Sequence, residues 1–532
     1  LARRLDWPRP LGASADSDLL AAAWGRWGPS LCEHLLGDYA FAVWDPRRSR
    51  LVVGRDALGV RPLYVFRDAR RIVACSGLRG LLHLPGFDPT PRMDWLRAYL
   101  EADEAFVRDT PFTSVRRVPP ATVIVFTPED ERDTRFWTPD PSRGAVPGGG
   151  LDDWADAVRH TAAMAVADRL RAVGPVAVES SGGLDSAGVV AHAVAATRTG
   201  RTLSTYTLVR EDVEGVPPRE AGHAVALDIA ASLGIARPVT LDSGGRGLVR
   251  ALERSVDIQA RPSLGVWVTY DYLYDTVAAN GSRVLLSGFG GDEAVSHRGY
   301  GFVHDLARHR WWRRLWLEIL ARHGGRLPAI RPFLGILLRE VMGSGDPRDG
   351  RGVVAGRVAR VTSPWTTERL ECSAMAAAAA GIEYRHPLLD LRLVELALAL
   401  PAHLEGTGGR ARAVWRRSLR GLLPAEVLER ETKGDGATPS SRARLERDRD
   451  RIRGLVDELL DRILDRSLDL GDMRRIRASA LGLVDPPALG GGALGLGQVR
   501  RAAQVELFLR RLDAGAQDSA TQDSGSILRT PG

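Results

Sequence analysis

The sequence predicts a two-domain α/β protein with a β-rich N-terminal domain and a C-terminal domain built on a parallel sheet. At 532 residues the chain is long enough for two hydrophobic cores. Residues 1–141 hold short β-rich runs separated by turns, whereas strands and helices alternate from residue 151 onward. Such alternation is typical of a parallel sheet covered by helices. A Pro- and Gly-rich segment at 142–150 is the predicted linker between the two domains.

The N-terminal strands are predicted from runs of β-branched and aromatic residues that end in turn-forming residues. These runs are 38–45, 50–56, 62–68, 71–76 and 121–126. The spacing of apolar residues predicts one helix near 93–101. We therefore expect a domain of short strands with a helical segment between them.

The C-terminal domain is predicted to begin with a helix at 151–170, because acidic residues precede a run with helical apolar spacing. The predicted strands are 175–180, 203–210, 236–241 and 282–287, and the helices among them end near 197 and span 219–233. The remainder of this domain is predicted to be mostly helical. The polar tail at 514–532 is predicted to be disordered.

Composition indicates a cytoplasmic protein without a membrane segment. No apolar run reaches the ~18 residues that span a bilayer, and Cys32, Cys75 and Cys372 lie far apart with no metal-ligand or disulfide spacing. A net charge of +7 is mild for this length. Arginines alternate with aromatics at 308–316, which fits a nucleic-acid face, an amphipathic helix or a peptide-docking surface, and we favour the last two.

A glycine-rich turn follows the strand at 175–180 and opens a helix. Its residues are Ser181, Gly182, Gly183, Leu184, Asp185 and Ser186. Glycines let a backbone approach an anion, N–H groups at a helix start point toward it, and serine hydroxyls add donors. The spacing of a Walker loop is missing, so we interpret this turn as a different kind of phosphate-binding loop rather than a generic tight turn.

A second glycine-rich turn, "SGFGGDE" at 287–293, follows the strand at 282–287. Ligands of open parallel sheets gather at the carboxyl ends of the strands, so Asp185 and Asp292 are expected to lie together there. Two carboxylates facing a triphosphate suit Mg²⁺, which prefers oxygen ligands. The sequence thus predicts a site for ATP and Mg²⁺ in which Ser287, Gly288 and Phe289 also contact the nucleotide.

Both turns resemble the ATP-pyrophosphatase (PP-loop) domain of the asparagine synthetase and β-lactam synthetase superfamily. "GIEYRHPLLD" at 381–390 and "LLPAEVLERETK" at 422–433 are similar to further motifs of that group, the second with one extra residue before the lysine. "GDYAFAVWD" and "GRDALGVRPLY", which lie between 37 and 64, resemble its N-terminal amidotransferase domain. The resemblance implies an Ntn-type, class II glutamine-amidotransferase-like domain at 1–141 and an ATP-dependent synthetase domain at 151–513.

Departures from the family pattern indicate which branch the chain belongs to. Glutamine-hydrolysing members place a nucleophilic cysteine at the mature amino terminus and an "SE" pair where this chain reads Ser76-Gly77, and Cys32 lies at neither position. We interpret the first domain as degenerate. Asparagine synthetases carry glutamate and β-lactam synthetases tyrosine where this chain has Phe289. This combination is most similar to the lasso-peptide cyclases, which join a peptide's N-terminal amine to an internal Asp or Glu.

The resemblance also implies roles for single residues. Lys433, the only lysine among 73 basic residues, is expected to stabilise the oxyanion formed during amine attack. Glu383 is the expected base, with Tyr384 or His386, although a structural ion pair between Glu383 and Arg385 is the alternative. Two further residues are assigned to the nucleotide, Arg412 at a phosphate and Leu208 at the end of the second strand. The aromatic segments at 267–274 and 311–316 are assigned to a peptide cradle or, more simply, to core packing.

Other functions stay open at the level of sequence. Within the ligases these are a β-lactam or carbapenam synthetase and an asparagine synthetase-type amide ligase. From other classes they are a tRNA-modifying adenylase and a non-catalytic scaffold. The cyclase reading implies a precursor peptide as substrate, a leader-binding protein and a leader peptidase as partners, and no nucleic acid or membrane.

Overall fold

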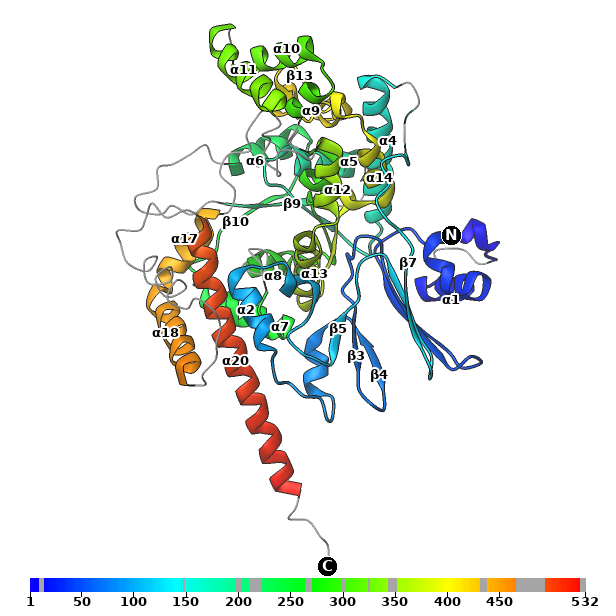
Figure 1. The fold of residues 1–532 in the computed structure, drawn as a ribbon, viewed down its shortest axis with the longest axis vertical. Coiled ribbons are helices and arrows are strands. Elements are labelled where there is room, and N and C mark those ends of the chain that lie inside the picture. The colour runs from blue at the N-terminus through cyan, green and yellow to red at the C-terminus, as the bar shows by residue number, and fades with distance from the viewer. Residues whose placement is uncertain are drawn as a thin grey trace, which may run out of the picture.

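The computed structural model describes residues 1–8, 14–144, 146, 149–197, 203–209, 222–263, 270–297, 302–323, 326–342, 352–430, 438–465 and 493–526. Two parts are visible in the ribbon, a β-rich part formed by the first third of the chain and an α/β part above it (Figure 1). The predicted α/β class with a parallel sheet in the second part is confirmed.

Two antiparallel sheets form the N-terminal part. One has the order β1-β2-β6-β7 and the other the order β4-β3-β5. The bounds are β1 (Ala40–Asp45), β2 (Arg50–Arg55), β3 (Tyr64–Arg67), β4 (Ile72–Cys75), β5 (Val115–Arg117), β6 (Thr122–Phe126) and β7 (Glu131–Arg135). All five predicted strands are present, and the predicted helix is α2 (Met93–Glu101). Two α-helices and two strands of this part were not predicted: α1 (Asp16–Trp27), α3 (Ala105–Arg108), the short β5, and β7, whose sequence ERDTR is entirely polar.

One parallel sheet of five strands, in the order β10-β9-β8-β11-β12, forms the centre of the C-terminal part. The strands are β8 (Val176–Glu179), β9 (Leu203–Leu208), β10 (Pro238–Leu241), β11 (Val284–Leu286) and β12 (Glu383–Arg385). Leu286 of β11 pairs with Val178 of β8 and with Arg385 of β12. The three strands therefore end at the same edge, and the residues that follow them meet there.

Helices pack around this sheet. The predicted helices are α4 (Leu151–Arg169), α5 (Leu184–Thr197) and α6 (Gly222–Ser232). The further α-helices of this part are α7 (Val249–Gln259), α8 (Asp271–Ala279), α9 (Phe302–Arg308), α10 (Trp312–His323), α11 (Arg326–Met342), α12 (Val353–Val361), α13 (Pro364–Ala379), α14 (Leu391–Ala399), α15 (Ala413–Ser418) and α16 (Ala425–Glu429). The C-terminal helices are α17 (Thr438–Arg447), α18 (Arg449–Asp465) and α20 (Ala493–Ser526). A hairpin of β13 (Gly406–Thr407) and β14 (Arg410–Ala411) precedes α15.

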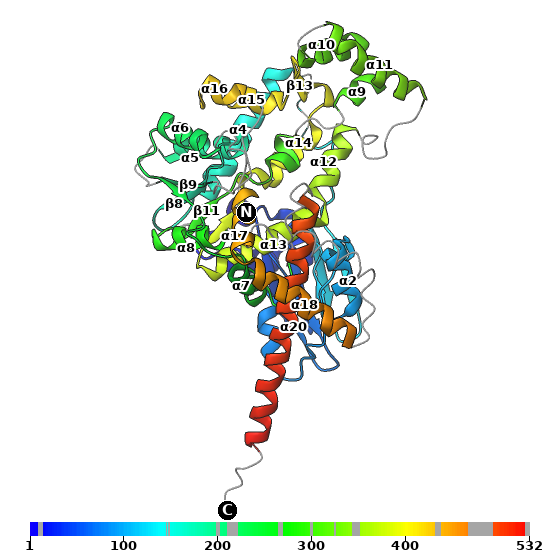
Figure 2. The same cartoon turned by 90° about the vertical axis from the view of Figure 1, so that its left-hand side faces the viewer.

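The C-terminal helices pack on the N-terminal part rather than on the parallel sheet. Phe508 of α20 and Leu459 of α18 are fully or almost fully buried in one cluster with Trp95 and Tyr99 of α2. The two views agree that α18 and α20 run side by side next to α2 (Figures 1 and 2). The structure extends α20 to Ser526, so residues 514–526 are helical where the sequence predicted a disordered tail.

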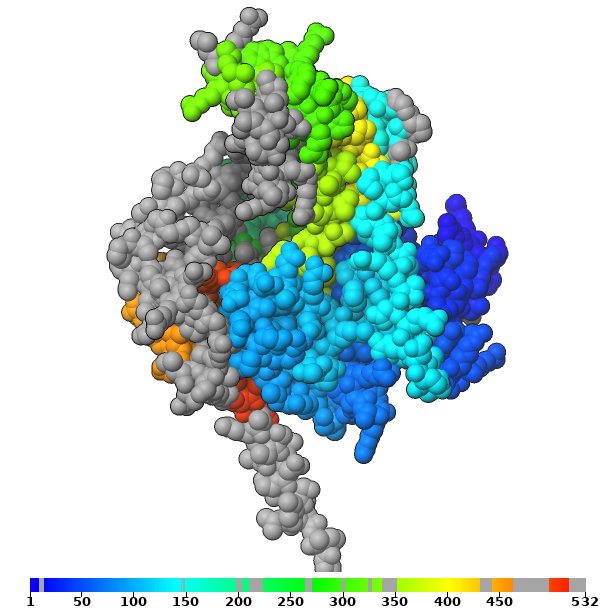
Figure 3. All heavy atoms as spheres, viewed as in Figure 1, coloured from blue at the N-terminus to red at the C-terminus, as the bar shows by residue number. Residues whose placement is uncertain are grey.

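The two parts share a continuous interior. Leu58, Val60 and Trp137 of the N-terminal part belong to the same buried cluster as Trp154 of α4 and Val176 of β8. In the space-filling view the light-blue atoms of the N-terminal part lie directly against yellow-green atoms of the C-terminal part (Figure 3). Within the described residues, none of the helices is long and apolar enough to cross a membrane.

Candidate functional site at the carboxyl edge of the parallel sheet

The first glycine turn is held in shape by its own serines. The Ser181 N–H donates to Ser186 Oγ at 3.1 Å, and Ser186 Oγ donates to the Gly183 carbonyl at 3.0 Å. Gly182 has a φ of +72°, a conformation that favours glycine. Asp185 follows in the first turn of α5, as the sequence predicts. Part of the hydroxyl capacity of both serines is thus used to maintain the loop.

The second glycine turn lies directly against the first. A Cβ atom at Gly288 would stand 2.7 Å from both the Cα and the N of Ser186, and one at Gly291 would collide with the Asp185 carboxylate. Only glycine permits this approach of two backbones. The Ser287 N–H donates to the Arg385 carbonyl at 3.0 Å and so ties the second turn to the end of β12. The structure therefore brings together the two turns that the sequence singled out.

Arg412 joins the two acids. Its Nη1 lies 3.5 Å from Asp185 Oδ2, its Nη2 is hydrogen-bonded to Asp292 Oδ1, and Ser296 donates to Asp185. All three charged side chains are partly buried, with 14–28% of each exposed. Arg412 has a left-handed φ of +64°, which is uncommon for a residue with a side chain and is found at functional sites. One guanidinium therefore lies between two carboxylates, so the site contains both positive and negative charge.

The donor set fits Mg²⁺ only in part. Among the described residues, His, Cys, Asp and Glu form no group of three or more that would enclose a metal ion. Two carboxylates are nevertheless what Mg²⁺ takes from a protein when nucleotide phosphates and water supply the other ligands. Asp185 and Asp292 would hold the ion, and Arg412 is placed to contact phosphate oxygens.

Phe289 forms an apolar wall beside the turns. Only 8% of Phe289 is exposed, and the Arg369 guanidinium lies 3.5 Å from the centre of its ring. The His386 ring meets Phe289 edge-on at 5.8 Å and lies 4.8 Å from the Tyr384 ring. Burial and the charge of Arg369 hold the pKa of His386 well below its usual value, and neither ring nitrogen has a hydrogen-bond partner within the described part of the chain.

A chain of hydrogen bonds crosses the sheet edge below Phe289. Tyr384 Oη donates to Ser287 Oγ at 3.2 Å, and Ser287 Oγ donates to Glu179 Oε2 at 2.7 Å. These residues come from β12, from the end of β11 and from β8, three neighbouring strands. Burial raises the pKa of Glu179, which hydrogen bonds from Tyr384 and Ser287 and the charge of Arg369 only partly oppose. Glu179 is a carboxyl group whose charged form is disfavoured.

Glu383, the base expected from sequence, has the contacts of the alternative reading. Its two carboxylate oxygens are hydrogen-bonded to Arg61 of the N-terminal part and to Arg385 on the same strand. Burial would raise the pKa of Glu383, but the hydrogen bond from Arg385 and the charge of Arg61 lower it. Glu383 is therefore a carboxylate between two cations, and the ion pair with Arg385 that the sequence offers as the alternative is present.

The remaining predicted residues fall in three groups. Lys433 and Trp267 lie outside the described residues. Leu208 is partly buried at the end of β9, and Tyr270, Tyr272 and Tyr274 are buried in the same apolar cluster. Trp312 and Trp316 pack on the core of α9 to α11, while Trp311 is 40% exposed. Core packing accounts for most of these aromatics.

Sequence reasoning missed Glu179, Ser296 and Arg369. Glu179 is the one charged residue in an otherwise apolar buried strand, and this is a signal that could have been used. Arg369 follows Glu368 in a helix rich in alanine and gives no local sign of facing Phe289. Ser296 lies four residues beyond Asp292, outside any motif that was recognised.

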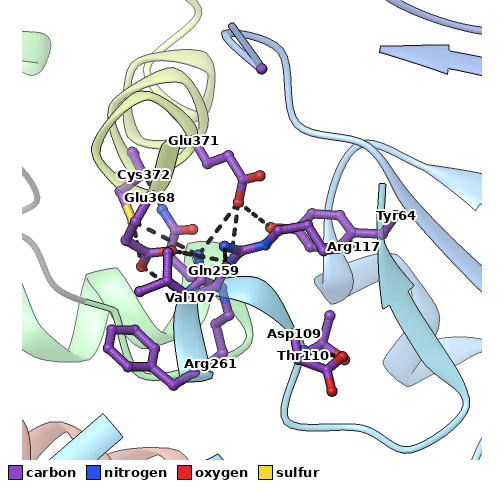
Figure 4. A network of polar contacts seen from close by, with 12 residues as sticks. Tyr64, Val107, Asp109, Thr110, Arg117, Gln259, Arg261, Glu368, Glu371 and Cys372 are labelled. Atoms are coloured by element: carbon purple, nitrogen blue, oxygen red, sulfur yellow. Dashed lines mark hydrogen bonds and ion pairs between the residues drawn. The ribbon is translucent and has the colours of Figure 1, made fainter. Parts of the chain in front are cut away.

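A buried ionic network connects the two parts of the chain next to this site. Arg117 and Tyr64 from the N-terminal part and Arg261 meet Glu368 and Glu371 of α13 (Figure 4). Arg55 adds a 2.6 Å hydrogen bond to Glu371. The side chains of Arg55, Arg261, Glu368 and Glu371 are at most 1% exposed. Arg369, which faces Phe289, belongs to the same helix.

None of the three thiols is poised for nucleophilic attack. Cys32 is 2% exposed, and burial raises its pKa to about 12. Burial likewise raises the pKa values of Cys75 and Cys372. A nucleophilic cysteine needs a thiolate, so these residues do not supply one for glutamine hydrolysis.

Comparison with known proteins agrees with this geometry. A family model described as asparagine synthase matches residues 157–491, and one described as a glutamine amidotransferase domain matches residues 8–137. The chain is 24% identical over 442 residues to an asparagine synthetase [glutamine-hydrolyzing] 3 of Bacillus subtilis, with 79% of this chain and 70% of that protein covered. A putative asparagine synthetase of Mycobacterium bovis is 23% identical at the same coverage of both chains. The amidase chry2 of Gibberella zeae is 29% identical over 187 residues, which are 34% of this chain and 27% of that protein. The chain thus belongs to the asparagine synthase family, and it is an asparagine synthetase-like, ATP-dependent carbon–nitrogen ligase.

Proposed function

We propose that this protein is an ATP-dependent lasso-peptide cyclase that works in the cytoplasm. It adenylates the side-chain carboxylate of an Asp or Glu within a precursor peptide and joins that carbon to the peptide's N-terminal α-amine. The products are an isopeptide macrolactam, AMP and pyrophosphate. A leader-binding protein and a leader peptidase would prepare the peptide.

The observation that carries this proposal is the wall at Phe289. Asparagine synthetases place glutamate and β-lactam synthetases place tyrosine at this position, and here the ring is buried against Arg369 and His386. A phenyl ring neither binds an ammonium by charge nor exchanges a proton. The unreactive thiols add to this, because none of them supplies ammonia from glutamine. An amine brought by a peptide substrate fits both features.

The first step activates the carboxylate. One carboxylate oxygen attacks the α-phosphorus of ATP and pyrophosphate leaves. Asp185 and Asp292 would hold Mg²⁺, which supplies charge neutralisation at the phosphates. Arg412 and the N–H groups of the first turn bind the departing pyrophosphate through charge-assisted hydrogen bonds.

The second step forms the amide. The α-amine has a pKa of about 7.7–8.0, so it loses its proton more readily than a lysine at about 10.4. Folding the peptide so that amine and adenylate meet removes a large part of the barrier. Lys433 is proposed to steady the oxyanion that develops on the attacked carbonyl.

A synthetic peptide with a free amino terminus and an internal Asp tests this function directly. With ATP and Mg²⁺ we expect loss of one water from the peptide, measured by mass spectrometry, and one AMP per ring. The N-acetylated peptide is the matched control and should release pyrophosphate without closing. Replacing the Asp by Asn should abolish pyrophosphate release.

An asparagine synthetase-type amide ligase is the second candidate, and the similarity to the Bacillus subtilis and Mycobacterium bovis synthetases favours it. Free aspartate with ammonium tests it in the same assay. Formation of asparagine at a rate above that of ring closure, across peptides with the acid at different positions, would replace the cyclase proposal.

A further inference from the structure

We propose that Glu179 is the base that takes the proton from the attacking amine, in place of Glu383. This inference rests on the proposed function, because it names the proton acceptor for the amide-forming step. It also goes beyond that function, since neither glycine turn nor any recognised motif includes Glu179.

The position of Glu179 suits this role. It is the last residue of β8 and stands two residues before Ser181, where the first glycine turn begins. Its Oε2 accepts a 2.7 Å hydrogen bond from Ser287, the residue that opens the second turn. Glu179 therefore lies between the two loops that form the nucleotide site, in a half-buried position.

The Glu179 carboxylate is oriented by a hydrogen bond from an uncharged hydroxyl group. Ser287 Oγ donates to Glu179 Oε2, and the Tyr384 hydroxyl in turn donates to Ser287 Oγ at 3.2 Å. Tyr270 before α8 and Tyr274 on α8 face it with neutral rings. Arg369 of α13 is the one cation whose charge acts on Glu179 among the described residues, and that guanidinium lies 3.5 Å from the centre of the Phe289 ring.

The environment of Glu383 is the opposite. Arg61 and Arg385 hold one oxygen each, so protonating Glu383 would break two charge-assisted hydrogen bonds. Side chains alternate along a strand, and Tyr384 points to Ser287, whereas its neighbour Arg385 donates to Glu383 and to the Arg169 carbonyl at the end of α4. Glu383 thus faces away from the hydrogen-bonded chain that includes Ser287.

The chemistry balances with Glu179 as acceptor. The neutral α-amine attacks the carbonyl carbon of the acyl-adenylate, and a C–N bond forms. The bond between that carbon and the AMP oxygen breaks, AMP leaves as the phosphate dianion, and one N–H proton passes to the Glu179 carboxylate. Burial raises the pKa of Glu179 toward the pH of the reaction, where a general base is most effective.

The test compares Glu179→Gln with Glu383→Gln in two half-reactions. Pyrophosphate release with the ring-forming peptide reports adenylation. Macrolactam formation reports amide closure. Hydroxylamine, which is largely unprotonated at neutral pH, is the probe that captures the adenylate without help from a base.

For Glu179→Gln we expect ring closure to fall by about a hundredfold or more, since a general base contributes about 10²–10⁴. Pyrophosphate release and hydroxamate formation should stay within about threefold of wild type. The wild-type rate of ring closure should fall as pH drops through the pKa of Glu179, and this step of the profile should vanish in the variant. Glu179→Asp should recover part of the rate.

Equal losses in closure and in hydroxamate formation would overturn the inference, because they would indicate a structural role. A selective loss of closure in Glu383→Gln rather than in Glu179→Gln would overturn it in favour of Glu383. If wild-type protein closes no peptide but joins another acid and amine, the proposed function fails. The rates of amide formation by Glu179→Gln and Glu383→Gln, measured with that acid and amine, then decide whether Glu179 is the base.

Discussion

Glu368 at the junction of the two parts makes a quantitative prediction. Its carboxylate accepts hydrogen bonds from Arg261 at 2.8 and 2.9 Å and from Arg117 at 3.1 Å. Burial alone would raise the pKa of Glu368, but these two arginines lower it from 4.5 to about 2. That interval corresponds to about 3 kcal/mol of unfolding free energy, at about 1.4 kcal/mol per pH unit.

The substitution Glu368→Gln keeps the shape of the side chain and removes its charge. Arg55, Arg117 and Arg261 would then share Glu371 as their one carboxylate in this network. Removing one member of a buried ion pair costs about 3–5 kcal/mol, in agreement with the value from the pKa. We therefore expect a loss of about 3 kcal/mol at neutral pH.

Urea unfolding measured at several pH values is the assay. Because the folded pKa of Glu368 lies below the unfolded one, its contribution is present above pH 4.5 and is lost as pH falls toward 2. Between pH 4.5 and pH 2 the wild-type protein should lose about 3 kcal/mol of unfolding free energy from Glu368. Glu368→Gln should not show this loss. Glu129→Gln, in the exposed turn between β6 and β7, is the matched control and should change stability by less than about 0.5 kcal/mol. A loss below about 1 kcal/mol for Glu368→Gln, with an unchanged acid profile, would refute the reasoning.

Three further predictions concern the site itself. Gly288→Ala should weaken ATP binding by more than tenfold, about 1.4 kcal/mol, because the new methyl group meets the Ser186 backbone at 2.7 Å; calorimetry checks this against Gly335→Ala, where no atom lies within 4 Å. Arg412→Met should lower AMP formation yet strengthen binding of Mg²⁺ without nucleotide, because Asp185 and Asp292 lose the cation between them; weaker Mg²⁺ binding would speak against their role. Alkylation of the folded protein should reach the half-buried Cys75 before Cys32, as mass spectrometry of the labelled peptides would show.

The sequence predicted the site where local patterns determine geometry. A glycine turn after a buried strand specifies both a backbone shape and a location, because parallel strands end at a common edge. The contact between Gly288 and Ser186 follows from that rule and from the absence of side chains. The five predicted strands of the first part and the helix bounds of α2 and α5 followed in the same way from apolar spacing.

Partner choice between distant residues could not be predicted. Glu383 pairs with Arg61, which is 322 positions away, and no local pattern distinguishes that arginine from the others in the chain. The polar strand β7 is held by its ladder to β6 rather than by its own propensity. In both cases the deciding interaction is tertiary, so periodicity and motifs in the sequence could predict neither the ion pair nor the strand.

Helix α13 links the amidotransferase-like part of the chain to the candidate site through ion pairs. One side of α13 carries Glu368 and Glu371, whose charges are compensated by Arg55 and Arg117 from the N-terminal part. The intervening Arg369 lies on Phe289. Without the N-terminal part, two buried carboxylates would lose most of their cationic partners, and the helix that carries Arg369 against Phe289 would lose these contacts. Helix α13 therefore couples the packing of the N-terminal part to the position of Arg369 against Phe289.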